Sequence, residues 1–218
     1  MPHSALLRTF GKTWMKPLTL AALIAPFAYL AVLWVLMLAN VEPYSMGFNP
    51  VKWTHHYLGD TALRILLVTL AISPIRDITG WAPIVVIRRR VGLAAFFYAL
   101  LHLIAYVGLN LNWSIPQLMQ DIAKRTYITL GIIALTLMIP LAVTSTNGMI
   151  RQMGRKAWER LHWLIYPLAI LAAAHDILMQ KTLFQIQPAT HAAILAVLLS
   201  WRVVRWVMSK LKPAEATA

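Results

Sequence analysis

Long apolar runs separated by short polar stretches dominate the hydrophobic pattern of this chain. A helix needs about 20 mainly apolar residues to cross a bilayer, and six runs meet that requirement. They lie near residues 17–39, 57–75, 91–111, 127–143, 162–178 and 189–208. The second and sixth contain arginines (Arg64; Arg202 and Arg205), so an interfacial helix is the alternative for these two. The pattern predicts an all-α, polytopic membrane protein, in which residues 1–218 form a single domain built as a bundle of six transmembrane helices.

Composition supports this interpretation and excludes other classes. Hydrophobic residues make up 60% of the chain and charged residues 12%, whereas soluble domains are about 45–50% apolar and about 25% charged. The chain has no cysteine, which removes disulfides, thiolate metal sites and iron–sulfur clusters. No phosphate-binding glycine loop or dinucleotide fingerprint is present. Any chemistry must therefore take place inside the bundle or at its edges.

The placement of basic residues predicts the orientation of the bundle. The net charge is +13, and fifteen of the 20 Lys and Arg residues fall on one side of the predicted spans. They are Arg8, Lys12, Lys16, Arg76, Arg88, Arg89, Arg90, Arg151, Arg155, Lys156, Arg160, Arg202, Arg205, Lys210 and Lys212. The opposite loops hold Lys52, Lys124, Arg125 and Lys181. The positive-inside rule then predicts that both termini are cytoplasmic. Nucleic-acid binding is disfavoured, because the basic residues alternate with spans and form no single patch.

Two of the seven histidines stand deep inside predicted spans and are candidate metal ligands. They are His102, in FFYALLHLIAYV, and His175, in LAILAAAHDIL. Ionisable residues within spans are costly and usually functional, and a rise of about 1.5 Å per residue puts both at a similar depth in the outer half of the membrane. Two imidazoles at one depth suit the axial positions of a haem iron, whereas a buried zinc would need three or four ligands. The alternative is that each histidine bonds a neighbouring helix and binds nothing.

The other histidines carry weaker signals. His162 lies near the cytoplasmic end of the fifth span, about 20 Å from His175 along the helix and about 140° away around it. It is therefore a candidate for a second, inner site. His55, His56 and His191 fall at the outer ends of spans. A solvated or interfacial position is the favoured interpretation for these three, and their roles stay open.

Four segments together carry a resemblance to a known family. They are RRRVGLAAFFYALLH followed by Tyr106, GDTALRILLVTLAISPIRD, TSTNGMIRQMGRKAWERLHWLIYPLAILAAAH, and WRVVRW. The chain resembles the ferric-reductase-like transmembrane superfamily over roughly residues 16–206. Within it, the chain is similar to the haem-binding membrane subunits of bacterial methionine sulfoxide reductase systems. After His175 the sequence DILMQK departs from the more aromatic run expected there.

The resemblance implies cofactors, partners and a location. It implies one or two b-type haems, with His102, His162 and His175 as ligands, and an associated FMN. It implies a multi-pass protein of the bacterial inner membrane, surrounded by lipid. Electrons would pass from a cytoplasmic flavin reductase to a periplasmic molybdopterin-containing methionine sulfoxide reductase subunit, for repair of oxidised envelope proteins. A quinone is a further candidate donor. Whether the chain is itself an enzyme stays open, because no substrate site of its own is evident.

Four arginines are further candidates for cofactor contacts. Arg64 either extends to the membrane interface or pairs with a haem propionate. The positive charges of Arg88, Arg89 and Arg90 mainly set the membrane orientation. The three side chains are also candidates to bind the propionate of an inner haem or a flavin phosphate. Two other functions remain open: a ferric- or metal-reductase-like protein or other quinone-linked cytochrome b on the same fold, and a non-redox transporter or scaffold. A transporter would be expected to show internal repeats, which are not seen.

Overall fold

The computed structural model describes residues 14–41, 46–179 and 186–211. Arg8, Lys12, Lys181 and Lys212, which enter the charge argument, lie outside these ranges. The described residues are helical, with no strand among them, and contain six helical segments long and apolar enough to cross a membrane. The prediction of an all-α, multi-pass membrane protein is confirmed. The elements are α2 (Met15–Leu38), α3 (Pro50–Thr79), η1 (Ala82–Ile87), α4 (Arg88–Ala105), η2 (Tyr106–Asn110), α5 (Ile115–Lys124), α6 (Thr126–Val143), α7 (Asn147–Met153), α8 (Arg155–Leu161), η3 (His162–Leu164), α9 (Ile165–Met179) and α10 (Ile186–Leu211).

The second helix is longer at both ends than the apolar run 57–75 that predicted it. Asn49 caps α3, its side chain accepting a hydrogen bond from the Lys52 amide at 2.9 Å, and Pro50 occupies the first helical position, where its missing N–H costs nothing. The helix ends at Gly80, whose φ of 68° is in the left-handed region. Polar residues continue the helix beyond its apolar stretch, so His55 and His56 lie within α3 and not in front of it.

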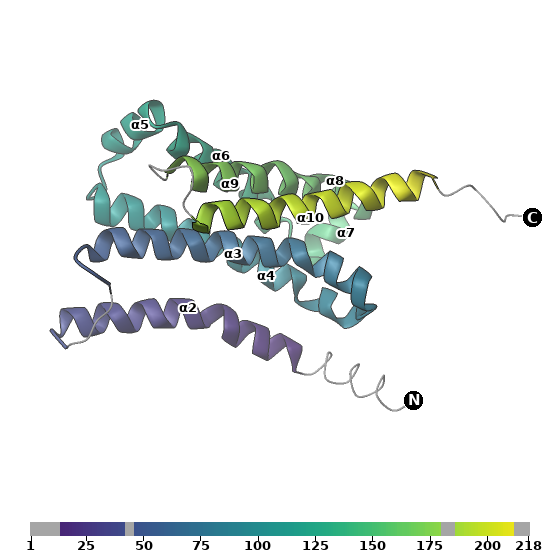
Figure 1. The fold of residues 1–218 in the computed structure, drawn as a ribbon, viewed down its shortest axis with the longest axis horizontal. Helices are drawn as coiled ribbons and strands as arrows, with labels where there is room; N and C mark the ends of the chain where they lie inside the picture. The colour runs from purple at the N-terminus through teal and green to yellow at the C-terminus, as the bar shows by residue number, and fades with distance from the viewer. Residues whose placement is uncertain (1–13, 42–45, 180–185, 212–218) are drawn as a thin grey trace, which may run out of the picture.

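Helix α3 lies at the centre of the bundle (Figure 1). Over its most apolar window 56% of the residues are buried inside the protein, compared with 11% for α2 and 6% for α10. Leucines along one side of it (Leu63, Leu66, Leu67 and Leu70) form the main core with residues of α4, α6, α9 and α10. The outer helices instead expose large apolar side chains, as expected for surfaces that face lipid.

Helix α2 is attached to this core through the side chain of Tyr98 of α4, whose hydroxyl bonds to backbone groups of α2. Pro26 interrupts the hydrogen bonding of α2, and one residue later the Tyr98 hydroxyl of α4 accepts from the Phe27 amide at 3.0 Å and donates to the Leu23 carbonyl at 2.7 Å. The Tyr57 hydroxyl donates to the Pro26 carbonyl at 3.0 Å. Groups freed near the proline are thus satisfied by neighbouring helices, a requirement in lipid.

The arginines of the sixth span have protein partners, which explains how α10 crosses the membrane. Arg202 donates to the Tyr166 hydroxyl at 2.8 Å and to the Leu70 carbonyl at 3.1 Å, and its guanidinium lies 5.2 Å from the Tyr166 ring centroid. Arg205 lies 3.6 Å from Asp77 at the end of α3. These contacts and the 26-residue length of α10 favour a span over the interfacial alternative.

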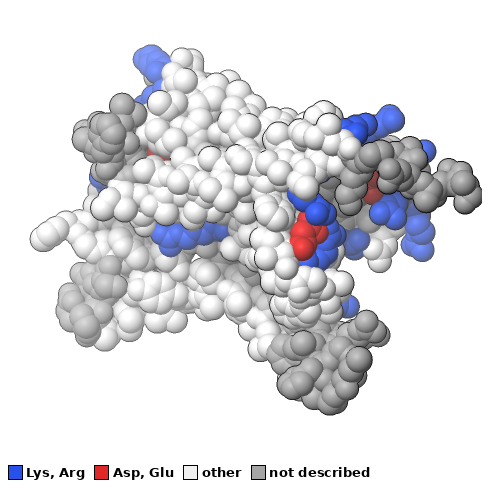
Figure 2. Space-filling view, turned by 45° about the vertical axis from the view of Figure 1, so that its right-hand side comes forward, with Lys and Arg blue, Asp and Glu red and all other residues white. Residues whose placement is uncertain are grey.

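Basic side chains gather at one end of the bundle. Helix α2 begins and α10 ends at that same end (Figure 1). Figure 2 shows Lys and Arg side chains concentrated there around a few acidic groups. At the other end, α5 lies across the ends of the spans and carries Lys124, followed by Arg125.

Candidate functional site

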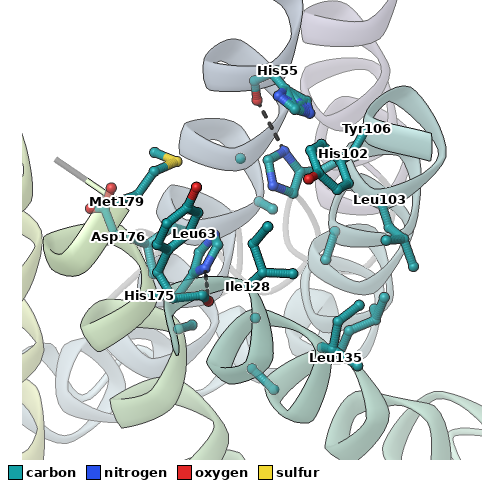
Figure 3. A pocket seen from close by; sticks show the side chains of 18 of the residues that line it. His55, Leu63, His102, Leu103, Tyr106, Ile128, Leu135, His175, Asp176 and Met179 are labelled. Atoms are coloured by element: carbon teal, nitrogen blue, oxygen red, sulfur yellow. Dashed lines mark hydrogen bonds between the residues drawn. The ribbon is translucent and has the colours of Figure 1, made fainter. Parts of the chain in front are cut away.

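A half-open cavity of about 290 Å³ lies between α3, α4, α6 and α9. Its walls are mainly apolar, and its polar groups are few. Two of them are His102 from α4 and His175 from α9, which Figure 3 shows reaching into the cavity from different helices. The two histidines selected by their predicted depth thus line one cavity.

Each of these imidazoles is held by a main-chain carbonyl. Nδ1 of His102 lies 3.0 Å from the His55 carbonyl of α3, and Nδ1 of His175 lies 2.6 Å from the Tyr127 carbonyl of α6. A carbonyl only accepts, so Nδ1 carries the proton in both rings. Among the described residues neither Nε2 has a hydrogen-bond partner. This is the arrangement in which a histidine offers Nε2 to a metal while its other nitrogen fixes the ring.

The separation of the two rings fits one metal between them. Their centroids are 6.1 Å apart, with an angle of 77° between the ring planes. A bond of about 2 Å from each imidazole to one metal would be compatible with this ring separation. In the part of the chain that the structure describes, no group of three or more His, Asp and Glu side chains could hold a metal ion. A site with two protein ligands suits haem better than zinc.

Two glycines allow the histidine rings to lie close to neighbouring helices. A Cβ added to Gly59 of α3 would lie 3.1 Å from Cε1 of His102, and one added to Gly131 of α6 would lie 2.9 Å from Nδ1 of His175. Any larger side chain would have to displace a ring. Neither glycine is distinguished by the hydrophobic pattern, although each is a small residue inside a predicted span.

One of the other histidines does not occupy the place expected for it. His191 was expected at a solvated or interfacial position, but it is 6% exposed and its Nδ1 lies 3.0 Å from Asp176 Oδ2. That expectation was wrong, because α9 and α10 bring two polar groups together inside the bundle. His55 and His56 line the cavity. The His55 ring stacks on Tyr106, with centroids 5.3 Å apart.

His162 lies outside the cavity of His102 and His175. It begins the short turn η3, its Nδ1 is 3.0 Å from the Trp158 carbonyl, and its ring stacks on Trp158 at 3.7 Å. The helix is irregular between His162 and His175 because η3 precedes α9, and Pro167 falls in the first turn of α9. Among the described residues, no second histidine contacts His162.

The four arginines that were candidates for cofactor contacts also lie away from the cavity. Arg64 points from α3 into a separate groove beside α10, with 54% of its side chain exposed and Asp60 3.7 Å away. Arg88 begins α4 and is half-buried, whereas Arg89 and Arg90 are exposed. Arg89 donates to the Asn147 side chain at 2.7 Å. None of the four lines the cavity that contains His102 and His175.

Comparisons with known proteins agree with this fold and with the resemblance. Residues 58–173 match the family described as ferric reductase like transmembrane component. The chain is 45% identical over 204 residues to the protein-methionine-sulfoxide reductase heme-binding subunit MsrQ of Xanthomonas axonopodis pv. citri, covering 93% of this chain and 90% of that protein. The subunit of the same name from Xanthomonas campestris pv. campestris is 43% identical over 199 residues, covering 91% and 89%.

A more divergent relative shows the same match. The heme-binding subunit MsrQ of Azospira oryzae is 41% identical over 160 residues, covering 73% of this chain and 69% of that protein. The family match includes α4 with His102 and the segment that contains His162. The chain therefore belongs to the ferric-reductase-like transmembrane family, in the group of MsrQ heme-binding subunits.

Proposed function

We propose that this protein is a b-type haem-binding, transmembrane electron-transfer subunit of a methionine sulfoxide reductase system. The observation that carries the proposal is the pair His102 and His175, with centroids 6.1 Å apart in one cavity and each Nδ1 bonded to a main-chain carbonyl. The names of its relatives, which are called heme-binding subunits, support the same cofactor.

The residues present fit a haem in three respects. The cavity walls offer apolar side chains to a macrocycle, the two Nε2 atoms have no hydrogen-bond partner among the described residues, and Gly59 and Gly131 leave room for the rings. His102 and His175 would hold the iron. When bound, haem supplies one-electron redox chemistry. The protein holds both imidazoles in one tautomer, through the carbonyls of His55 and Tyr127.

The direction of electron flow follows from the predicted orientation. The basic end of the bundle would face the cytoplasm, so a cytoplasmic flavin reductase would deliver electrons there, and a periplasmic molybdopterin-containing subunit would receive them at the α5 end. The protein would then lie in the bacterial inner membrane and act in repair of oxidised envelope proteins. FMN and quinone are further candidate partners at the entry side. His162, together with Arg88, would belong to that entry region or to a second, inner haem.

Visible spectroscopy of the purified protein tests the haem assignment. The wild type should show the sharp alpha and Soret bands of a reduced low-spin b-type haem. His102→Ala and His175→Ala should each abolish the low-spin spectrum, and added imidazole should restore it, because the free ligand fills the space left by the side chain. A wild type that takes up no haem would refute the function, and full wild-type spectra in both variants would refute the ligands.

The number of haems is tested separately. If His162 holds an inner haem, the haem-to-protein ratio should fall from two to one in His162→Ala while the spectrum of the remaining haem is unchanged. A ratio of one in both proteins would assign His162 to the entry region alone.

A further inference from the structure

The carboxylate of Asp121, on the surface helix α5, points inward, and each of its two oxygens contacts a neighbouring side chain. Asp121 has 16% of its side chain exposed. Its Oδ2 accepts a hydrogen bond from the Tyr106 hydroxyl, and its Oδ1 lies 3.0 Å from Nε of Arg125. The two oxygens therefore contact different side chains, Tyr106 and Arg125. Each of these side chains contacts a residue whose main-chain carbonyl holds one histidine of the cavity.

The first connection runs through Tyr106 to His102. The Tyr106 ring stacks on the His55 imidazole, with centroids 5.3 Å apart and planes 19° from parallel. The His55 main-chain carbonyl accepts from Nδ1 of His102 at 3.0 Å. Tyr106 is thus clamped between Asp121 and the turn of α3 that fixes the His102 ring.

The second connection runs through Arg125 to His175. Nη1 of Arg125 donates to the Tyr127 hydroxyl at 3.2 Å. The main-chain carbonyl of Tyr127 accepts from Nδ1 of His175 at 2.6 Å. The salt bridge between Asp121 and Arg125 therefore restrains the first turn of α6, which carries the acceptor for His175.

The backbone between α4 and α5 brings Asp121 against Tyr106, which lines the cavity. Tyr106 opens the π-helical turn η2, and π turns are frequent at functional sites. After it, Asn112 and Trp113 both have positive φ, of 46° and 63°. A bulky residue such as tryptophan adopts this conformation only where the surroundings hold it there. The chain reverses at this point, so that α5 returns to meet Tyr106.

We propose that Asp121 is a positioning residue for both His102 and His175, acting through Tyr106 and Arg125. This inference rests on the proposed haem function. Partners that orient metal-bound histidines set ring orientation and metal affinity, and their loss typically costs 10–100-fold in affinity. Asp121 occupies this role for two ligands at once, from a helix at the end of the bundle opposite the basic residues.

Four variants of the haem-loaded protein test the proposal. Tyr106→Phe removes the first connection and keeps the ring, and Tyr127→Phe removes the second and keeps the carbonyl. Asp121→Asn weakens both, since an amide has one acceptor oxygen only. Lys124→Gln is the control, because it changes an exposed charge on α5 that contacts neither tyrosine. Low-temperature electron paramagnetic resonance of the ferric haem and the rate of haem transfer to apomyoglobin are measured.

The size of the expected change differs between the variants. Asp121→Asn should broaden and shift the low-spin signal and raise the haem-transfer rate about tenfold, each tyrosine variant should show a smaller change, and Lys124→Gln should match the wild type. The tyrosine variants keep the charge of Asp121, so a change in them is not an effect of charge alone. Wild-type signals and rates in all variants would overturn the positioning role while leaving the haem function intact, and a wild type without haem would overturn the function itself.

Discussion

At the scale of single residues, the candidate site depends on small groups as much as on the histidines. His102 and His175 can approach their carbonyl partners because glycines stand where the rings pass. The contact at Gly131 is the tighter of the two, since an added Cβ would be 2.9 Å from Nδ1 of His175. The neighbouring polar groups Asp176 and His191 contact each other, with 3.0 Å between Asp176 Oδ2 and His191 Nδ1, and the His175 imidazole contacts the Tyr127 carbonyl instead.

Gly131→Ala should therefore reduce haem binding. The methyl group would push the His175 ring away from the Tyr127 carbonyl, and loss of such an orienting partner lowers metal affinity about 10–100-fold. Haem content per purified protein is the measurement. Gly92→Ala is the matched control, because its Cβ would meet only Thr69 Cγ2 at an ordinary 3.5 Å. Equal haem content in the two variants would show that the glycine is not required.

At the scale of elements, the helices are joined by polar contacts placed where their backbones are irregular. Tyr98 inserts into α2 beside Pro26, and Arg202 of α10 reaches the Leu70 carbonyl of α3. These contacts explain how α2 and α10, the least buried spans, stay attached to the bundle. In lipid there is no hydrophobic force between helices, so packing and interhelical hydrogen bonds must hold them.

Tyr98→Phe should loosen α2 without removing it from the membrane. The variant loses the hydroxyl that bonds the Phe27 amide and the Leu23 carbonyl, and we expect a loss of about 1 kcal/mol in the free energy of unfolding. Unfolding by SDS in mixed micelles measures it. Thr136→Val on α6 serves as the control, because that hydroxyl bonds only its own helix, at the Ile132 carbonyl. A Tyr98→Phe protein as stable as the control would show that the Tyr98 hydroxyl does not stabilise the attachment of α2.

At the scale of the whole molecule, the distribution of charge predicts how the bundle lies in the membrane. Most of the described basic residues gather at the end where α2 begins and α10 ends (Figure 2). Positive loops stay in the cytoplasm during insertion, so α5 and the part of the cavity lined by Tyr106 and Arg125 would face the periplasm. This places the candidate haem nearer to the side where the electron acceptor would bind.

The absence of cysteine makes the orientation directly measurable. Single cysteines at Gln120 on α5 and at Lys156 on α8, both exposed, can be introduced into a chain that has none. A membrane-impermeant maleimide should label Gln120→Cys in intact spheroplasts and Lys156→Cys only after permeabilisation. The reverse pattern would invert the topology and the proposed direction of electron flow.

The sequence by itself determined the six spans, their approximate limits and the similar depth of His102 and His175. These properties are local: the cost of placing a residue in lipid and the rise of a helix act along the chain and require no knowledge of neighbours. Only the tertiary structure decided which groups meet. The carbonyls that hold the two histidines are 47 and 48 residues away in sequence, and the burial of His191, the outward direction of Arg64 and the position of Asp121 depend on how each helix is rotated against the others. Rotation is set by packing between distant segments, so no pattern within one segment contains it.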